Sequence, residues 1–288
     1  FEIWKYLNAI NQQPTTDNRQ QEGYGLGDVL KELDSNEKLK HFIEEYRGYY
    51  FLRGRKDLVA QRIERNKISQ RKIRIVKKVV RWLRFVPFVR SVAVAGRLAM
   101  KNAESKSDLD LLVILKKGRI FTGRLLVTLV VHILGKRRHG HRISNRICLN
   151  HFITTKGEIS GRDLFGAHEY AFLMPIFGAK AFSKFHTRNG WIRRYKLNFQ
   201  PAARVSDMVS DNRLARSVRK SLEKILDFDR IEEFLGGLQK KKIANNPKTR
   251  QAGGIILCNE DELAFWPNFE NQGPRIFDEF QERLGKLK

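Results

Sequence analysis

The segment between positions 91 and 114 places the tightest limit on how this chain can fold. An apolar run, Ser91–Ala95, stops at Gly96, and a short helical pattern, Leu98–Asn102, follows. A second apolar run begins at Ser107 and continues to Ile114. Short apolar runs bounded by turn residues are typical of buried strands. The segment therefore predicts a strand, a glycine turn, a short helix and a second strand.

Two carboxylates, Asp108 and Asp110, open the second of these strands. Side chains alternate between the two faces of a strand, so residues two apart point to the same side, with Cα atoms about 6–7 Å apart. Two negative charges this close repel each other unless a cation lies between them. Mg²⁺ binds one or two carboxylates together with phosphate oxygens. We therefore expect Asp108 and Asp110 to bind Mg²⁺ or Mn²⁺.

The composition is that of a folded and strongly basic protein. A chain of 288 residues with 41% hydrophobic and 30% charged residues has enough apolar side chains for a core, which excludes a disordered tail. At about 150 residues per domain, this length predicts about two domains. The 56 lysines and arginines outnumber the 31 acidic residues and give a net charge of +25. A field of this sign attracts polyanions, so we expect nucleic acid as a partner.

The two cysteines and the apolar runs bear on where the protein works. Cys148 and Cys258 lie far apart and have no Cys-x-x-Cys companion, which argues against a disulfide framework and structural zinc. The longest apolar run, Leu125–Leu134, is about half as long as a membrane span. No secretory signal is visible at the start of the chain. We therefore expect a cytoplasmic protein with no membrane partner.

A change of charge near positions 46–57 predicts the first domain boundary. Residues 1–46 hold 5 basic and 9 acidic side chains, whereas residues 47–90 hold 15 basic and 2 acidic ones. Within residues 1–55 we expect a short helix to position 10, a loop over 11–23, a helix over 26–39 and a two-stranded ribbon over 42–53. This order is typical of a winged-helix-like unit. Its acidic charge leaves a packing or dimerisation role open, because a DNA-reading helix is usually basic.

Residues 56–159 form the second predicted domain, which begins with one long basic helix over 56–85. Apolar residues recur along this helix at helical spacing, and most other positions are basic. Its basic side chains fit two compatible roles, covering the core with their stems and contacting phosphate backbones. An apolar helix over 120–135 and a strand over 147–153 follow. The basic stretch 136–142 between them is either a contact loop for nucleic acid or triphosphate, or a solvated helix exit.

Residues 160–288 form the third predicted domain, which we expect to be mainly helical. The pattern predicts a basic loop over 245–254 and a short strand over 255–258. The expected helices cover residues 161–177, 179–195, 211–226, 231–241 and 274–287.

The order of strand, Gly96-Arg97, ten further residues and Asp108-Leu109-Asp110 resembles the signature of the nucleotidyltransferase superfamily of DNA polymerase beta type. The resemblance covers most of the chain, and it implies an α+β fold. In that fold a mixed sheet is flanked by helices, with an N-terminal winged-helix-like unit and a helical C-terminal domain. Several further stretches look like bacterial nucleotidyltransferase-domain-containing proteins: Tyr50–Arg55, Val92–Met100, Ser107–Asp110, Ile147–Asn150 and Asp163–Glu169.

The resemblance also implies a reaction. Members of this superfamily move a nucleoside monophosphate from a nucleoside triphosphate to an acceptor, and the basic charge favours a nucleic-acid end as that acceptor. Asp108 and Asp110 would be the catalytic metal ligands. The nucleotide-binding positions implied by the resemblance are Gly96, Arg97, Ser107 and Asn150. A glycine turn suits close approach of the backbone to phosphate, and the helix after it offers free N–H groups.

Two departures from the family pattern leave an alternative open. Arg97 stands where the family usually has glycine or serine, and it either grips the triphosphate or fills the pocket. A third carboxylate is expected on the later strand, where this chain has Asn150 and His151. Asparagine cannot act as a base, and alternation places His151 on the opposite face. The alternative is a catalytically degenerate nucleotidyltransferase-fold protein that binds nucleic acid or has a regulatory role.

Overall fold

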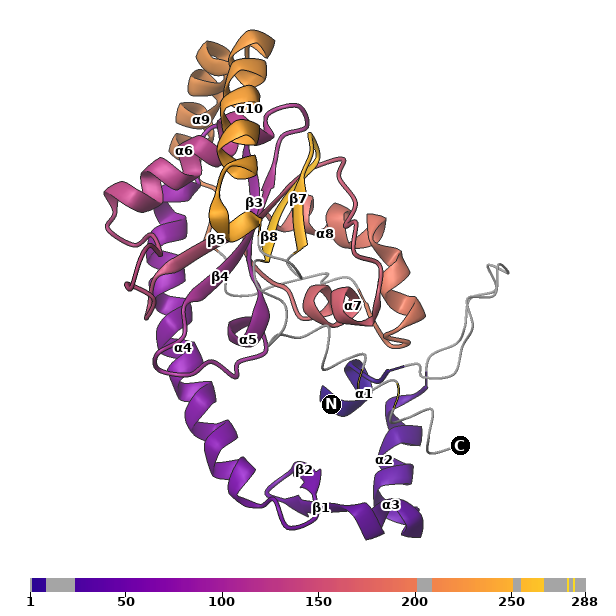
Figure 1. Ribbon diagram of the computed structural model, residues 1–288. Helices are drawn as coiled ribbons and strands as arrows, with labels where there is room; N and C mark the ends of the chain where they lie inside the picture. Colours follow the sequence, from indigo (N-terminus) through magenta and orange to yellow (C-terminus); the bar gives the residue numbers. More distant parts are fainter. Residues whose placement is uncertain are drawn as a thin grey trace.

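The computed structural model describes residues 2–8, 24–200, 209–250 and 255–266, together with Glu279 and Glu282. The fold is α+β, with a six-stranded mixed sheet flanked by helices (Figure 1). The loop expected over 11–23 lies outside the described residues, as do both ends of the helix expected over 1–10 and most of the helix expected over 274–287. Within the described ranges, no helix is both long enough and apolar enough to cross a membrane.

The elements largely follow the order expected from the sequence. The helices are α1 (Glu2–Lys5), α2 (Leu26–Ser35), α3 (Glu37–Phe42), α4 (Asp57–Leu83), α5 (Gly96–Ala99), α6 (Ile120–Ile133), α7 (Leu164–Ala171), α8 (Ala179–Arg188), α9 (Arg213–Leu226) and α10 (Asp229–Ala244), with short 3₁₀ turns at Gly190–Arg194 and Pro247–Thr249. The strands are β1 (Ile43–Tyr46), β2 (Tyr49–Leu52), β3 (Val89–Val94), β4 (Leu109–Leu115), β5 (Ile147–Thr154), β6 (Met174–Phe177), β7 (Ile255–Cys258) and β8 (Glu262–Trp266).

The large sheet has the strand order β6-β3-β4-β5-β8-β7. Only β4 and β5 pair in parallel, and the chain between them passes through α6, as parallel neighbours require a crossover. All other neighbours are antiparallel. β4 is buried along its whole length except at Asp110, because helices cover both faces of the sheet. Asp110 is therefore the only polar residue of β4, and the only one that is not fully buried.

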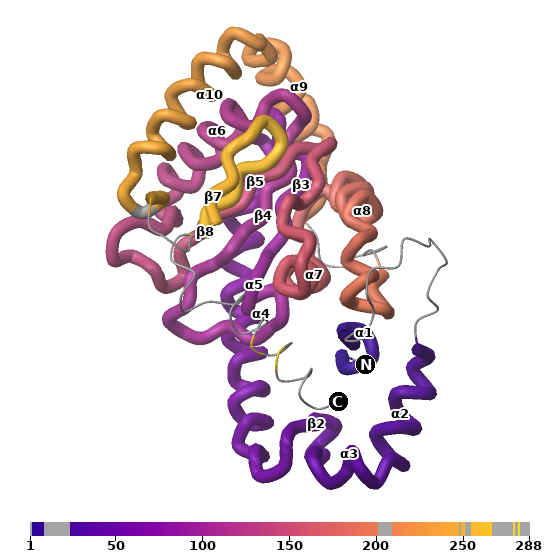
Figure 2. Tube along the Cα trace, turned by 45° about the vertical axis from the view of Figure 1, so that its right-hand side comes forward, coloured from indigo at the N-terminus to yellow at the C-terminus, as the bar shows by residue number. Residues whose placement is uncertain are grey.

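Helices form a layer on each face of the sheet (Figures 1 and 2). On one face, Val76 and Val80 of α4 and Val127 and Val131 of α6 join the core, and α10 packs against α6. On the other face, Tyr170 of α7 and two phenylalanines of α8 form a second core cluster. Both layers bury large aliphatic or aromatic side chains against the strands, and this burial is the main favourable term in folding.

The N-terminal unit differs in one respect from the expected helix over 26–39. The chain becomes extended at Asn36, whose side chain accepts a hydrogen bond from the Leu39 amide at 3.0 Å and begins a new helix, α3. The ribbon is present as the antiparallel pair β1–β2. Arg47 and Gly48 both have positive φ (55° and 77°) at its turn, as a tight two-residue hairpin requires.

The C-terminal range contributes more strand than its sequence pattern indicates. The helix expected over 161–177 is wrong in its last part, because α7 ends at Ala171 and Met174–Phe177 forms β6 at the edge of the sheet. Pro175 suits an edge strand and not a helix interior, since it lacks the amide hydrogen. The strand Glu262–Trp266 was not expected either, and it pairs with both β5 and β7.

Two buried polar residues of α4, Lys72 and Ser69, hold the loop that leads to β4. Lys72 is only 2% exposed, and its Nζ donates hydrogen bonds to Ser105 O at 3.1 Å, Ser107 O at 2.8 Å and Asn145 Oδ1 at 2.9 Å. The Ser69 hydroxyl accepts a hydrogen bond from the Ala103 amide at 3.0 Å. These contacts fix the backbone directly before Asp108.

Replacing Lys72 by methionine should therefore destabilise the protein. Three carbonyl oxygens in a part-buried place would lose their donor, and leaving such groups unsatisfied costs about 2–3 kcal/mol of unfolding free energy. Urea unfolding of Lys72→Met measures this loss. The control is Lys67→Met, since Lys67 is 62% exposed and pairs with Glu64 at 3.9 Å, which contributes little. Equal midpoints for the two variants would show that Lys72 does not hold this loop.

Candidate metal centre

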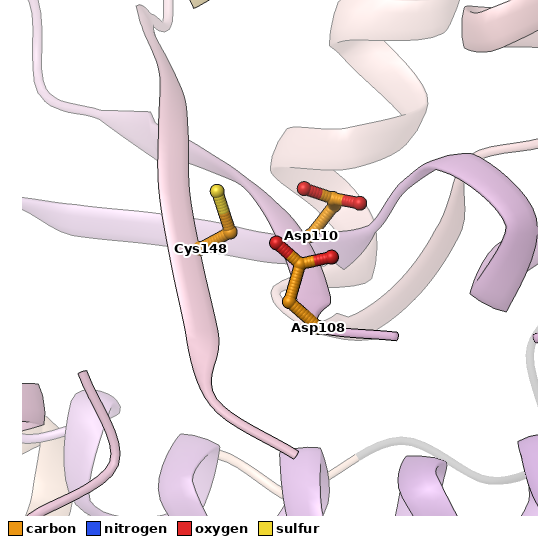
Figure 3. A group of neighbouring side chains, drawn as sticks. All are labelled: Asp108, Asp110 and Cys148. Atoms are coloured by element: carbon orange, nitrogen blue, oxygen red, sulfur yellow. The ribbon is translucent and has the colours of Figure 1, made fainter. Parts of the chain in front are cut away.

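Three side chains that can bind a metal meet at the start of the parallel strand pair. Asp108 directly precedes β4, Asp110 is its second residue, and Cys148 stands opposite Asp110 on β5. One ligand atom from each lies within 4.8 Å of the others. Figure 3 shows the two carboxylates side by side, with the thiol beside them. Asp108 and Asp110 thus share a side of the strand, as alternation predicts.

The turn at Gly96 lies against this cluster and requires glycine for two reasons. Its φ of +59° is in the left-handed region that other residues rarely adopt. A Cβ atom at this position would lie 3.3 Å from Asp110 Oδ2 and 4.0 Å from Glu169 Oε2. The backbone carbonyl of Asp110 accepts a hydrogen bond from the Ala95 amide at 3.0 Å, which joins the turn to β4. The strand–turn–helix segment is therefore folded directly onto the acidic pair.

Glu169 of α7 brings a third carboxylate to the site, and the sequence analysis did not assign it. Its Oε2 and the Asp110 Oδ2 both lie beside the Gly96 turn. One sequence signal could have identified it, because Glu169 is the only acidic residue inside the mainly apolar helix Leu164–Ala171. The local sequence does not show which face of the sheet α7 covers, so the structure was needed to place Glu169 beside Asp110.

A buried hydrogen-bond chain fixes the helix that carries Glu169. The Tyr170 hydroxyl lies 3.1 Å from His151 Nδ1, and His151 Nε2 lies 3.0 Å from Glu262 Oε1. These contacts link α7 to β5 and β8 through side chains that are almost fully buried. His151, weighed from the sequence as a base, is therefore engaged on both ring nitrogens by Tyr170 and Glu262.

The electrostatic environment of the cluster disfavours several negative charges at once. Burial raises the pKa of Asp110 to about 7, and the charges of Asp108 and Glu169 act in the same direction. Burial also raises the pKa of Glu169 to about 7. The pKa of the Cys148 thiol is raised by burial and by both aspartates, so the thiol stays protonated at neutral pH. A bound cation would relieve this repulsion.

A guanidinium group already supplies one positive charge at this place. Arg138 Nη1 lies 2.5 Å from Asp108 Oδ2 and 3.5 Å from Cys148 Sγ. The Asp108 carboxylate thus already pairs with one positive charge. Carboxylate oxygens are also the ligands that Mg²⁺ and Mn²⁺ prefer. The neutral thiol is a poor ligand for such hard ions. Asp108 and Asp110 therefore fit a divalent ion, with Cys148 as their neighbour.

The remaining residues singled out from the sequence lie at different distances from the cluster. Asn150 is adjacent, since its Nδ2 lies 3.4 Å from Asp110 Oδ1. The Arg97 side chain is 66% exposed, and its Nη1 pairs with Glu104 Oε1 at 2.9 Å. The Ser107 hydroxyl donates to Glu104 O at 2.9 Å within the preceding loop. The structure brings Gly96, Asp108, Asp110 and Asn150 together, whereas Arg97 on α5 and Ser107 in the following loop both contact Glu104.

Comparisons of the chain with models of protein families, with curated proteins and with solved structures found no match.

The raised pKa values predict that the metal-free protein loses stability as the pH rises. Asp110 and Glu169 keep their protons in the folded state up to about pH 7, whereas the unfolded chain releases them near the ordinary values of 3.8 and 4.5. Stability from these groups is thus complete below pH 3.8 and is lost as the pH rises through about 7. Asp110→Asn removes one of them, so its melting temperature should fall less between pH 5 and 8.

Melting curves with a chelator present test this prediction. Glu233→Gln serves as the control, because Glu233 is exposed and its substitution should leave the pH dependence of the wild type unchanged. Mn²⁺ should raise the melting temperature of the wild type more at pH 8 than at pH 5.5, since it competes with protons for the same oxygens. Parallel pH profiles for the wild type and Asp110→Asn would contradict the assignment.

Proposed function

We propose that this protein is a metal-dependent nucleotidyltransferase, which moves a nucleoside monophosphate from a nucleoside triphosphate to an acceptor. The observation that carries the proposal is the acidic pair Asp108 and Asp110 packed against the Gly96 turn. The third carboxylate beside them, Glu169, adds support. The α+β architecture agrees with a nucleotidyltransferase-type sheet, and the order of helices and hairpin before α4 agrees with a winged-helix-like unit.

Asp108 and Asp110 are the residues that would hold Mg²⁺ or Mn²⁺. When bound, the ion stabilises the negative charge that develops on the attacking and leaving oxygens of a phosphoryl group. Gly96 leaves the space next to Asp110 free of a side chain, so that a phosphate chain can come close to the backbone. Asn150 offers a neutral amide beside Asp110 that can bind the donor nucleotide.

Glu169 is well suited to accept the proton of the attacking hydroxyl. In the reaction the acceptor oxygen forms a bond to the α-phosphorus, the bond to the pyrophosphate oxygen breaks, and the hydroxyl proton passes to a Glu169 oxygen. A general base works best when its pKa is near the working pH, and burial raises the pKa of Glu169 to about 7. Its carboxylate lies next to the turn that would face the phosphates.

A nucleic-acid end is the acceptor class that the charge favours. The net charge of +25 attracts polyanions, and the basic segment 136–142 reaches the acidic cluster through Arg138. A polyanionic acceptor would be drawn to this side of the molecule before any specific contact is made.

One observation favours a second function, that of a nucleic-acid-binding or regulatory protein on a degenerate site. Arg138 already neutralises Asp108, and Asn150 stands where the family pattern has a carboxylate. In that case the basic surfaces bind polyanions and no nucleotide is transferred. The two functions differ in whether the acidic pair is needed for turnover.

A transfer assay separates the two candidates. Labelled nucleoside triphosphates, Mg²⁺ or Mn²⁺, and a panel of RNA and DNA ends should give label transfer that Asp110→Asn lowers about 10²–10³-fold, because charge stabilisation by the metal is lost. The control Glu233→Gln should keep the wild-type rate. Absence of transfer, together with RNA binding that weakens steeply with salt, would favour the second function.

The role of Glu169 has its own test. Glu169→Gln should lower kcat about 10²–10⁴-fold and remove the rise of kcat with pH near 7, because the base is lost. Binding of the nucleoside triphosphate should change little, since glutamine keeps the size of the side chain. A variant with normal kcat and an unchanged pH profile would show that the proton goes elsewhere.

A further inference from the structure

Arg138 is held at the acidic cluster by the backbone of its own segment. Its amide donates to Ile147 O at 2.9 Å, and the Ile147 amide donates to Lys136 O at 2.7 Å. These two hydrogen bonds attach residues 136–138 to the first residue of β5, next to Cys148. The attachment fixes the Cα of Arg138, whereas its long side chain remains able to change rotamer.

The guanidinium uses only part of its hydrogen-bonding capacity. Nη1 bonds to Asp108 and lies near Cys148, whereas Nε and Nη2 have no hydrogen-bond partner in the described ranges. The side chain is 44% exposed, and that of Asp108 is only 16% exposed. A guanidinium carries five donors in a planar fork that matches two phosphate oxygens. Arg138 therefore presents unused donors to solvent at the rim of the site.

A divalent ion and Arg138 cannot both occupy the same side of Asp108. Arg138 Nη1 lies 2.5 Å from Asp108 Oδ2, so an ion bound to the Asp108 carboxylate would lie close to the guanidinium, and the two positive charges would repel each other. A polyphosphate carries several negative charges and offers the guanidinium a second, bidentate partner outside the cluster. Leaving Asp108 is then favourable for Arg138, and the carboxylate becomes free.

We propose that Arg138 is a counter-ion exchanged between Asp108 and the phosphate chain of the nucleoside triphosphate. In the free protein it keeps Asp108 neutralised and metal binding weak, and bound triphosphate draws it away and opens the oxygen ligands to the ion. Metal and triphosphate therefore bind with positive coupling, which by linkage acts in both directions. This inference rests on the nucleotidyltransferase function proposed above and adds its regulation.

The first test measures Mn²⁺ binding without nucleotide, by electron paramagnetic resonance of free Mn²⁺. Arg138→Gln should bind Mn²⁺ about tenfold more tightly than the wild type. Arg142→Gln is the matched control, because Arg142 lies in the same segment and the same charge is lost. An equal gain in both variants would overturn the exchange, since it would come from net charge alone.

The second test measures ATP binding in the presence of a chelator, by titration calorimetry. Arg138→Gln should weaken ATP binding, and Asp108→Asn should strengthen it more than Asp110→Asn does, since only Asp108 bonds to the guanidinium. The difference between Asp108→Asn and Asp110→Asn should vanish when Arg138 is also replaced. Equal effects of the two aspartate variants in the wild-type background would overturn the proposal.

A double variant separates this proposal from the function on which it rests. Arg138→Gln with Asp110→Asn should lose the tight Mn²⁺ binding of Arg138→Gln. If that binding persists, the acidic pair is not the metal site, and both proposals fail. If the double variant loses it but Arg138→Gln gains nothing over Arg142→Gln, the metal site stands and only the exchange is excluded.

Discussion

The burial of neighbouring carboxylates is the constraint on which the rest of this site depends. Asp108 and Asp110 lie at the start of β4, and α7 places Glu169 beside the same Gly96 turn. Burying these groups costs free energy, and this cost appears as pKa values of about 7 for Asp110 and Glu169. At Asp110 the charges of Asp108 and Glu169 add to the effect of burial. Natural proteins keep such strained groups mainly where they serve a function.

The parts of the site that depend on local sequence could be predicted, and those that depend on long-range packing could not. The glycine turn and the shared side of Asp108 and Asp110 follow from short-range rules, namely φ preference and strand alternation. Glu169 and Arg138 reach the cluster from elements that lie 59 and 28 positions after Asp110, respectively. Nothing in the local pattern states where α7 or the segment before β5 will pack.

The same distinction explains the errors in the fold. The long helix α4 was predicted nearly residue by residue, because its periodicity extends over many turns. β6 and β8 were not, since a strand of four or five residues is defined by its partners in the sheet. Within residues 161–177, only Pro175 indicated that the expected helix would end early. Asn36 likewise divides a predicted helix, because an asparagine side chain competes with the backbone for hydrogen bonds.

The long helix α4 connects the β1–β2 hairpin to the backbone that carries the acidic pair. Its 27 residues rise about 1.5 Å each, so this single rod extends from the β1–β2 hairpin to the sheet (Figure 1). Near its middle, Lys72 donates hydrogen bonds to the backbone carbonyl groups directly before Asp108. Because the helix is stiff and Lys72 bonds to this backbone, tilting the N-terminal end of α4 would displace the backbone before Asp108. A displacement of the β1–β2 hairpin would therefore be transmitted to the acidic pair through α4.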